Sequence, residues 1–247
     1  MSRPRLYVPN LDPSGGHVVL ATSEAHHVTR VLRLRPGAEV RVFDGRGREW
    51  TAHLVPGPTR AAVAVMMDAE VAAVPEPRVR VTLAAGLLKG DHMDAVIRDA
   101  TMMGAAAIVP VVSEHVAVPQ KAWKTGAAVE RWTRVGVASA KQCGRAVVPD
   151  IAAPQDLRSV LTGAAAQMTV MFVEPSQGVS SSAVGSVGGR RPERALVLIG
   201  PEGGWSGREV EQARAAGATF AHLGPRTIRA DAMAAVALSA LWTVWGG

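Results

Sequence analysis

The chain has 247 residues, of which 48% are hydrophobic. This is near the length at which one core divides into two, so a disordered or small disulfide-built protein is excluded and two domains are favoured. A net charge of +6 favours an anionic partner. The single cysteine leaves no cysteine-based metal cluster and favours the reducing cytoplasm. Apolar runs are too short to cross a bilayer, so no membrane contact is expected.

Residues 1–72 have the features of a small β-rich module. Apolar and polar side chains alternate over 39–43 and 61–66, which is typical of strands with one buried face. Tight turns between strands are indicated by Pro-Gly and Asp-Gly pairs at 36–37, 44–45 and 56–57. A proline-marked linker over 73–77 follows, and the second domain is predicted to span 78–247.

The second domain alternates strand-like and helix-like segments, which predicts an α/β fold. Strands are predicted at 79–84, 107–112, 168–173, 195–199 and 219–223, and helices at 91–103 and 127–140. Ser206 and Glu209 have the spacing of a capping box, and Gly217 suits the end of the helix that they begin. The segment 176–191 is rich in Ser and Gly, so a mobile loop is expected there.

The chain ends in an apolar helix. One face is predicted to carry Met233, Val236, Ala237, Ala240, Leu241 and Val244. Such a stripe fits either a subunit contact or the protein's own core.

Two loops of unusual composition follow predicted strands, IGPEGG at 199–204 and LGPR at 223–226. Loops of this kind often hold ligands. Pro201 breaks the glycine spacing of a dinucleotide-binding loop and removes an amide donor. Glu202 would repel phosphate and attract a cation, so a small positively charged ligand such as a sulfonium suits the loop. Glu202 could equally well cap the following helix, because a negative charge is favourable near a helix N-terminus.

These loops, together with EAHHVTRVLRLR at 24–35, FDGRG at 43–47, KGD at 89–91 and QCGR at 142–145, occur in the order of one family. Over nearly its whole length the chain resembles SPOUT-class, S-adenosylmethionine-dependent rRNA methyltransferases, specifically those that methylate N3 of one uridine in 16S rRNA. It departs from them in TMMG at 101–104, where TELG is usual, and in RADA at 229–232, where RTET is usual. The second departure keeps a carboxylate at Asp231.

The resemblance implies a PUA-like, RNA-binding β-barrel over 1–72 and a SPOUT α/β domain with a deep trefoil knot over 78–247. It also implies a homodimer, S-adenosylmethionine as cofactor, and 16S rRNA or the small ribosomal subunit as partner. The implied cofactor-binding residues are Val173, Glu174, Pro175, Leu198, Ile199, Gly200, Pro201, Glu202, Gly203, Gly204, Leu223, Gly224, Arg226, Ile228 and Ala232.

Methyl transfer from a sulfonium requires positioning and a deprotonated N3, but no metal. Arg229 is the candidate stabiliser of negative charge on the base, and Asp231 or Glu202 is the candidate base or orienting group. Arg229 and Asp231 could instead form a purely structural ion pair.

The basic side chains expected at the RNA are Arg30, Arg33, Arg35, Lys89 and Arg98. A solvated basic face explains the first three equally well. His26 and His27 do not predict a metal site, because adjacent side chains on a helix diverge and no third ligand is suitably spaced. Two other functions remain compatible with the sequence, a noncatalytic RNA-binding protein of the same fold and a SPOUT methyltransferase with a different RNA target.

Overall fold

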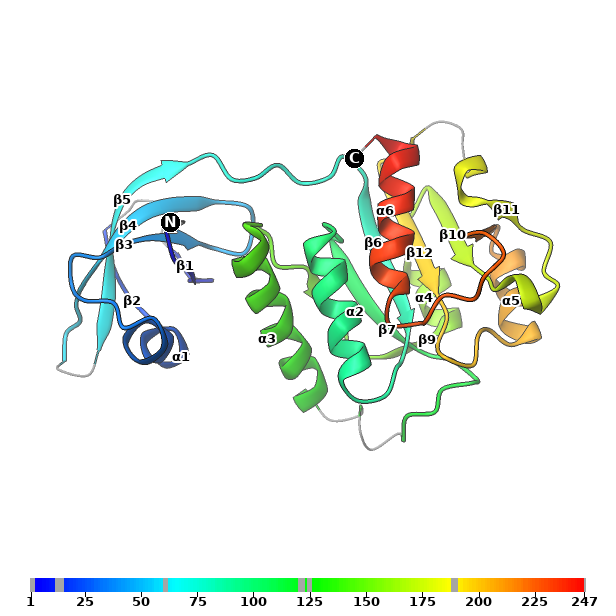
Figure 1. The fold of residues 1–247 in the computed structure, drawn as a ribbon, viewed down its shortest axis with the longest axis horizontal. Coiled ribbons are helices and arrows are strands. Elements are labelled where there is room, and N and C mark those ends of the chain that lie inside the picture. Colours follow the sequence, from blue (N-terminus) through cyan, green and yellow to red (C-terminus); the bar gives the residue numbers. More distant parts are fainter. Residues whose placement is uncertain are drawn as a thin grey trace. The chain divides into compact units, whose positions relative to one another are not determined.

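The computed structural model describes residues 3–11, 16–59, 62–119, 123, 126–187 and 191–246. The chain divides into two compact units, one formed by Met1–Glu76 with Ala140–Val148 and the other by Pro77–Ser139 with Pro149–Gly247. Figure 1 shows both units along the chain. The segment Ala140–Val148 was not expected in the first unit, because it lies far from the other residues of that unit in the sequence.

The first unit is built on a curled five-stranded sheet, as expected for a β-rich module. Its strands are β1 (Arg5–Tyr7), β2 (His17–Val19), β3 (Glu39–Phe43), β4 (Glu49–Pro56) and β5 (Val63–Val71), in the order β1-β3-β4-β5-β2. Strands β3, β4 and β5 form an antiparallel meander, and β1 pairs with β3 in parallel. Val40, Val42 and Leu54 alternate with more exposed residues and fill the core beneath the sheet. A short helix, α1 (Thr22–His26), continues as the π-helical turn His27–Val31.

Arg5 explains why Ala140–Val148 belongs to this unit. Its guanidinium donates hydrogen bonds to the carbonyls of Ala140 at 2.7 Å and Arg145 at 3.2 Å, and it pairs with Glu49 at 2.9 Å. Lys141 also pairs with Glu24 at 2.8 Å. A cation at the carbonyl end of a helix satisfies acceptors that have no partner within the helix. The end of α3 (Gly126–Cys143) is therefore fixed by side chains more than a hundred positions away in the sequence.

The second unit is a parallel sheet in the order β11-β13-β10-β12-β6-β7-β8, with β9 paired to β7. Its strands are β6 (Arg80–Gly86), β7 (Ala107–Val112), β8 (Asp150–Ile151), β9 (Gln155–Asp156), β10 (Met168–Phe172), β11 (Ser182–Ala183), β12 (Arg194–Ile199) and β13 (Thr219–His222). Strand β10 lies between β12 and β13, although β12 and β13 follow each other in the chain. The chain therefore crosses β10 on its way from β12 to β13.

Helices cover both faces of this sheet, as the continuous apolar strands predicted. They are α2 (Asp91–Met102), α3, α4 (Leu157–Gly163), α5 (Gly207–Ala215) and α6 (Met233–Trp245). Val197 and Ile199 point to the face covered by α2 and α6, whereas Leu196 and Leu198 point to the face covered by α4 and α5. Figure 1 shows α2 and α6 in front of the sheet and α5 behind it. The loops that follow these strands therefore extend from a sheet that is buried on both faces.

The buried face of α6 differs from the predicted one. Ala234, Ala237, Leu238 and Leu241 are fully buried, whereas Val236 is 38% exposed. The helix is apolar nearly all round, so no row of charged residues marks its solvent side in the sequence. The prediction was wrong by about one position, and the stripe through Val236 is partly exposed.

The segment 176–191 also differs from its prediction as a mobile loop. It contains most of a 3-10 helix (Pro175–Gln177), strand β11 and a second 3-10 helix (Val184–Ser186). Residues 188–190 lie outside the described residues. Pairing of β11 with β13 orders a stretch whose composition carries little local signal. Across the described ranges, no helix is both long and apolar enough to span a membrane.

We expect Leu196→Ala to lower the free energy of unfolding by about 2–5 kcal/mol, because Leu196 is fully buried and its loss leaves a cavity in the α4–α5 side of the core. Urea denaturation followed by circular dichroism would measure the change. Met102→Ala, at a side chain 39% exposed, is the control and should cost far less. Equal losses in both variants would contradict this account of the core.

Candidate functional site

A cavity of about 540 Å³ lies where β10, β12 and β13 end. Three loops line it, 172–177 after β10, 200–205 after β12 and 223–233 around the start of α6, and His92 of α2 adds a fourth segment. The carboxyl ends of parallel strands meet at one edge of a sheet, which is where open α/β sheets bind ligands. The strand order brings the two loops singled out in the sequence to this one cavity.

Side chain to backbone hydrogen bonds hold the loops together. The indole Nε1 of Trp205 donates to the carbonyl of Phe172 at 3.2 Å, and Gln177 Nε2 donates to the carbonyl of Trp205 at 2.7 Å. Thr227 Oγ1 donates to a carboxylate oxygen of Glu174 at 3.3 Å, which joins the third loop to the first. The cavity wall is therefore cross-linked and does not depend on the backbone of any one loop.

Two glycines are required by the closeness of these segments. A Cβ on Gly86, at the end of β6, would lie 2.4 Å from the backbone nitrogen of Pro201. Gly204 has a φ of 66°, and a Cβ there would lie 2.9 Å from Gln177 Nε2. Larger residues would push the glycine loop away from the sheet or from the first loop.

The helix that follows the glycine loop begins with the predicted capping box, which is confirmed. Ser206 accepts from the amide of Glu209, and Glu209 Oε2 accepts from the amide of Ser206 at 2.8 Å. The other Glu209 oxygen accepts from the amide of Glu114 at 3.0 Å, and Glu209 is only 3% exposed. One buried carboxylate thus ties the loop after β7 to the glycine loop.

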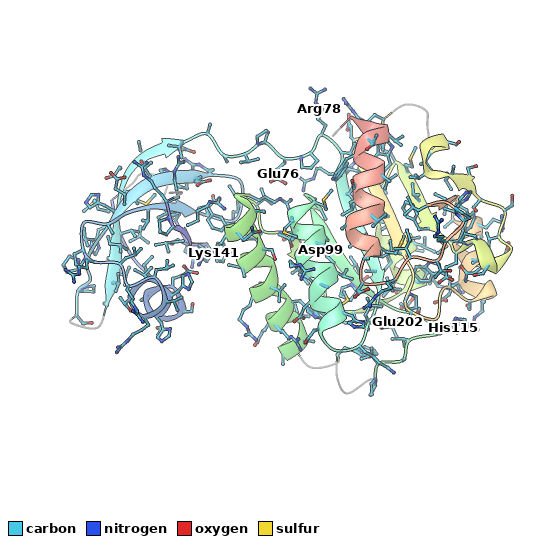
Figure 2. The ribbon with its side chains drawn as sticks, viewed as in Figure 1. Glu76, Arg78, Asp99, His115, Lys141 and Glu202 are labelled. Carbon is cyan, nitrogen blue, oxygen red and sulfur yellow. The ribbon has the colours of Figure 1, made fainter. Side chains whose placement is uncertain are left out.

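His115 and Glu114 strengthen this tie. His115 Nδ1 lies 3.0 Å from the carbonyl oxygen of Gly203, at hydrogen-bonding distance. Glu114 pairs with Arg208, and hydrogen bonds from Ser206 and then Arg208 lower the pKa of the Glu114 carboxyl. Figure 2 labels His115 and Glu202 in the second unit. His115 and Glu209 therefore hold the glycine loop through contacts that are not part of the cavity lining.

Inside the cavity, four ionisable side chains form two pairs. Arg229 Nε and Nη2 donate to the two oxygens of Asp231 at 3.0 and 2.8 Å. These hydrogen bonds lower the pKa of Asp231 and raise the pKa of Arg229, so both groups stay ionised. Separately, His92 Nδ1 lies 3.6 Å from Glu202 Oε1. The ion pair considered from the sequence does form, and its members line the cavity.

The chain matches two family models, an RNA methyltransferase domain over residues 75–242 and an RNA methyltransferase PUA domain over residues 20–65. It is 32% identical to the ribosomal RNA small subunit methyltransferase E of Synechocystis sp., over 90% of this chain and 71% of the relative. The chain belongs to this methyltransferase family. A second relative, the enzyme of the same name from Bacillus subtilis, is 27% identical over 88% of this chain and 86% of its own.

Solved structures agree with this membership. The small subunit methyltransferase E of Neisseria gonorrhoeae bound to S-adenosyl methionine has a TM-score of 0.88 at 27% identity, with 99% and 98% of the two chains covered. A methyltransferase of Legionella pneumophila in complex with the same cofactor has a TM-score of 0.89 at 26% identity, with 98% of each chain covered. The predicted fold class, a PUA-like module and a SPOUT α/β domain, is confirmed.

The cavity contains many of the residues marked in the sequence. Those on its lining are Val173, Glu174, Pro175, Gly200, Pro201, Glu202, Gly204, Leu223, Arg226, Ile228, Arg229 and Asp231. Leu198 and Ile199 instead lie in the core beneath it, and Gly203 is held against His115. Gly224 and Ala232 belong to the third loop but are not on the lining.

Sequence reasoning missed other lining residues, namely His92, Phe172, Gln177, Trp205 and Met233. Gln177 had a detectable signal, because it stands three positions after Glu174 and completes a capping box there. The others follow or flank the marked motifs without a spacing pattern of their own. Among the described residues, no three His, Cys, Asp or Glu side chains are grouped as metal ligands.

The basic residues expected at RNA lie in both units. Arg30, Arg33 and Arg35 are exposed in the first unit, and within its described part none has a carboxylate at ion-pair distance. Arg33 has a φ of 53°, an uncommon conformation for a residue other than glycine. In the second unit Lys89 is exposed, and Arg98 pairs with Asp99 at 2.7 Å.

Glu209→Ala should lower the free energy of unfolding by about 3 kcal/mol, because it leaves the buried amide of Ser206 and the part-buried amide of Glu114 without their acceptor. Thermal unfolding and chemical denaturation would measure the loss. Glu211→Ala is the matched control on the same helix, since its side chain is 71% exposed. Similar small effects of both substitutions would refute the role given to Glu209.

Proposed function

We propose that this chain transfers the methyl group of S-adenosylmethionine to N3 of a specific uridine in small-subunit (16S) rRNA, as a cytoplasmic homodimer. The observation that carries the proposal is the cavity at the strand ends, where Arg229, Asp231 and Glu202 meet in a chain of the small subunit methyltransferase E family. The relatives and solved structures named above support the reaction class and the cofactor.

The cavity suits S-adenosylmethionine in size and chemistry. Its volume of about 540 Å³ lies within the range of small-molecule sites. Phe172, Trp205 and Met233 contribute apolar surface, and the carboxylates of Glu174 and Glu202 favour a positively charged ligand. When bound, the cofactor supplies a methyl group on a positively charged sulfur, which is electrophilic without a metal.

Three charged residues of the cavity have different roles in the proposed reaction. Arg229 is positioned to stabilise the negative charge that spreads onto the oxygens of a deprotonated uracil. Asp231 holds the guanidinium of Arg229 through two hydrogen bonds. Glu202 has no such guanidinium partner in the described part of the cavity, so its carboxylate is available as a proton acceptor.

RNA binding is assigned to basic side chains of both units. The β-rich module over 1–72 presents Arg30, Arg33 and Arg35, which have no competing carboxylate among the described residues. In the catalytic domain over 78–247, Lys89 is exposed, and Arg98 must exchange its contact with Asp99 for a phosphate.

Dimerisation is assigned to the exposed stripe of α6. Val236 is 38% exposed on a helix that is apolar nearly all round. A helix of this kind is normally buried on every side. Association of two copies through α6 would remove this apolar surface from water.

Arg229→Ala should reduce kcat for methyl transfer on the order of 1,000-fold, because one preorganised charge at the reacting base is lost. Transfer of a radiolabelled methyl group to small-subunit RNA measures the rate, and calorimetry measures cofactor binding. Arg214→Ala is the control, since Arg214 is exposed and pairs with Glu211 on α5, away from the cavity. Full activity of Arg229→Ala would contradict the assigned role.

The same assay separates the other functions that the sequence allows. Binding of small-subunit RNA without any binding of S-adenosylmethionine would establish a noncatalytic RNA-binding protein. Methylation of another RNA, or at a site other than uridine N3, would establish a related enzyme with a different target. Mapping the modified position on RNA from a strain that lacks the gene decides between these outcomes.

Arg30→Ala, Arg33→Ala and Arg35→Ala should each weaken RNA binding and reduce the slope of log K against log salt by about 0.7, as expected for one lost phosphate contact to a single strand. Filter binding over a series of salt concentrations measures the slope. Arg3→Ala is the control in the same unit, because Arg3 already pairs with Glu39 at 2.6 Å. Unchanged slopes would assign these arginines to a solvated face.

A further inference from the structure

His92 lies in the cavity, although no motif marked it as part of the site. It occupies the first turn of α2, and its half-exposed side chain lines the cavity with Glu202 and Asp231. Its Nδ1 atom is 3.6 Å from Glu202 Oε1, a distance that a small side-chain rotation or one bridging water converts into hydrogen bonding. An imidazole has one donor and one acceptor nitrogen, so it can pass a proton between a carboxylate and solvent.

The two cavity carboxylates near His92 differ in their ability to accept a proton. Both oxygens of Asp231 already accept hydrogen bonds from Arg229, which lower the pKa of Asp231 and make it a poor base. Among the described residues, His92 is the ion-pair partner of Glu202, and the Glu202 side chain is 42% exposed. Glu202 therefore keeps lone pairs free for the substrate.

The carboxylates next to His92 on α2, and Asp231 in the third loop, are paired with arginines. On its own helix, Asp91 and Asp94 both contact Arg131 at 2.6 Å. From the third loop, Asp231 is held by Arg229. His92 can therefore hydrogen-bond to Glu202 and exchange a proton with it without breaking an existing ion pair.

We propose that His92 and Glu202 act together as the proton-accepting pair of the methyl transfer. Glu202 receives the proton of the base, and His92 is the positioning residue that orients the Glu202 carboxylate and passes the proton to solvent. This inference rests on the proposed function, since it concerns the N3 proton of a uridine substrate.

The step balances without another reactant. The N3–H bond breaks and its proton moves to Glu202, while the electron pair left on N3 forms the new N–C bond. The methyl C–S bond breaks at the same centre, and its electron pair converts the sulfonium to a neutral thioether. The proton leaves through the half-exposed imidazole of His92 to water.

His92→Gln should reduce kcat on the order of 100-fold and leave the KM for S-adenosylmethionine within about twofold. The pH dependence of kcat should also differ between the wild type and His92→Gln, because the variant lacks the imidazole that accepts and releases the proton. Initial rates from pH 4.5 to 8.5 measure both quantities.

A double-mutant cycle tests whether the two residues act as one unit. The variant with both His92→Gln and Glu202→Gln should be no slower than the slower single variant, because residues of one unit are not additive. His53→Gln is the matched control, since His53 lies in the first unit and pairs with Asp68. It should retain the wild-type rate and pH profile.

Three outcomes overturn the inference. They are an unchanged rate in His92→Gln, a reduced rate with an unchanged pH profile, and fully additive losses in the double variant. A wild-type enzyme that binds S-adenosylmethionine but does not methylate uridine N3 would instead refute the proposed function. Calorimetry on every variant separates loss of cofactor binding from loss of chemistry.

Discussion

The position of β10 between β12 and β13 is the constraint on which the site depends. It places the ends of three strands side by side, so that the loops that follow them share one cavity. Each loop alone is a short turn with glycine or proline. Together they place Arg229, Asp231 and Glu202 around one cavity, which His92 of α2 also lines.

Once the loops meet, buried polar contacts determine how rigid the cavity is. The Glu209 carboxylate ties the glycine loop to the segment after β7, and Trp205 and Gln177 tie it to the loop after β10. Buried polar groups are costly unless they are satisfied, so these bonds make one loop arrangement much more stable than its alternatives. A reaction that depends on alignment needs such a preformed site.

Electrostatics then gives similar side chains different roles. Asp231 and Glu202 both line the cavity, but two hydrogen bonds from Arg229 keep Asp231 ionised and occupied. Glu202 faces only a histidine at ion-pair distance within the described residues. The same contrast separates Arg98, which is engaged by Asp99, from Arg30, which has no acidic partner in the described part of its unit. Local partners, rather than residue type, decide which charges remain available for a substrate.

Local patterns in the sequence were enough to predict most of the secondary structure. The strand over 107–112 and the capping box of Ser206 and Glu209 depend on residues close together in the chain, and they were predicted correctly. The glycine loop and the segment with Arg229 and Asp231 were recognisable because their composition is unusual for simple connections. The family resemblance, carried by such motifs, supplied the fold class and the expected cofactor.

Long-range contacts were beyond such patterns. The binding of Ala140–Val148 to Arg5, the buried side of α6 and the pairing of β11 with β13 all depend on residues distant in the sequence. His92 entered the site for the same reason, since the start of α2 approaches Glu202 only after the sheet has formed. Periodicity and spacing report on neighbours along the chain, whereas a cavity is made by segments that meet through packing.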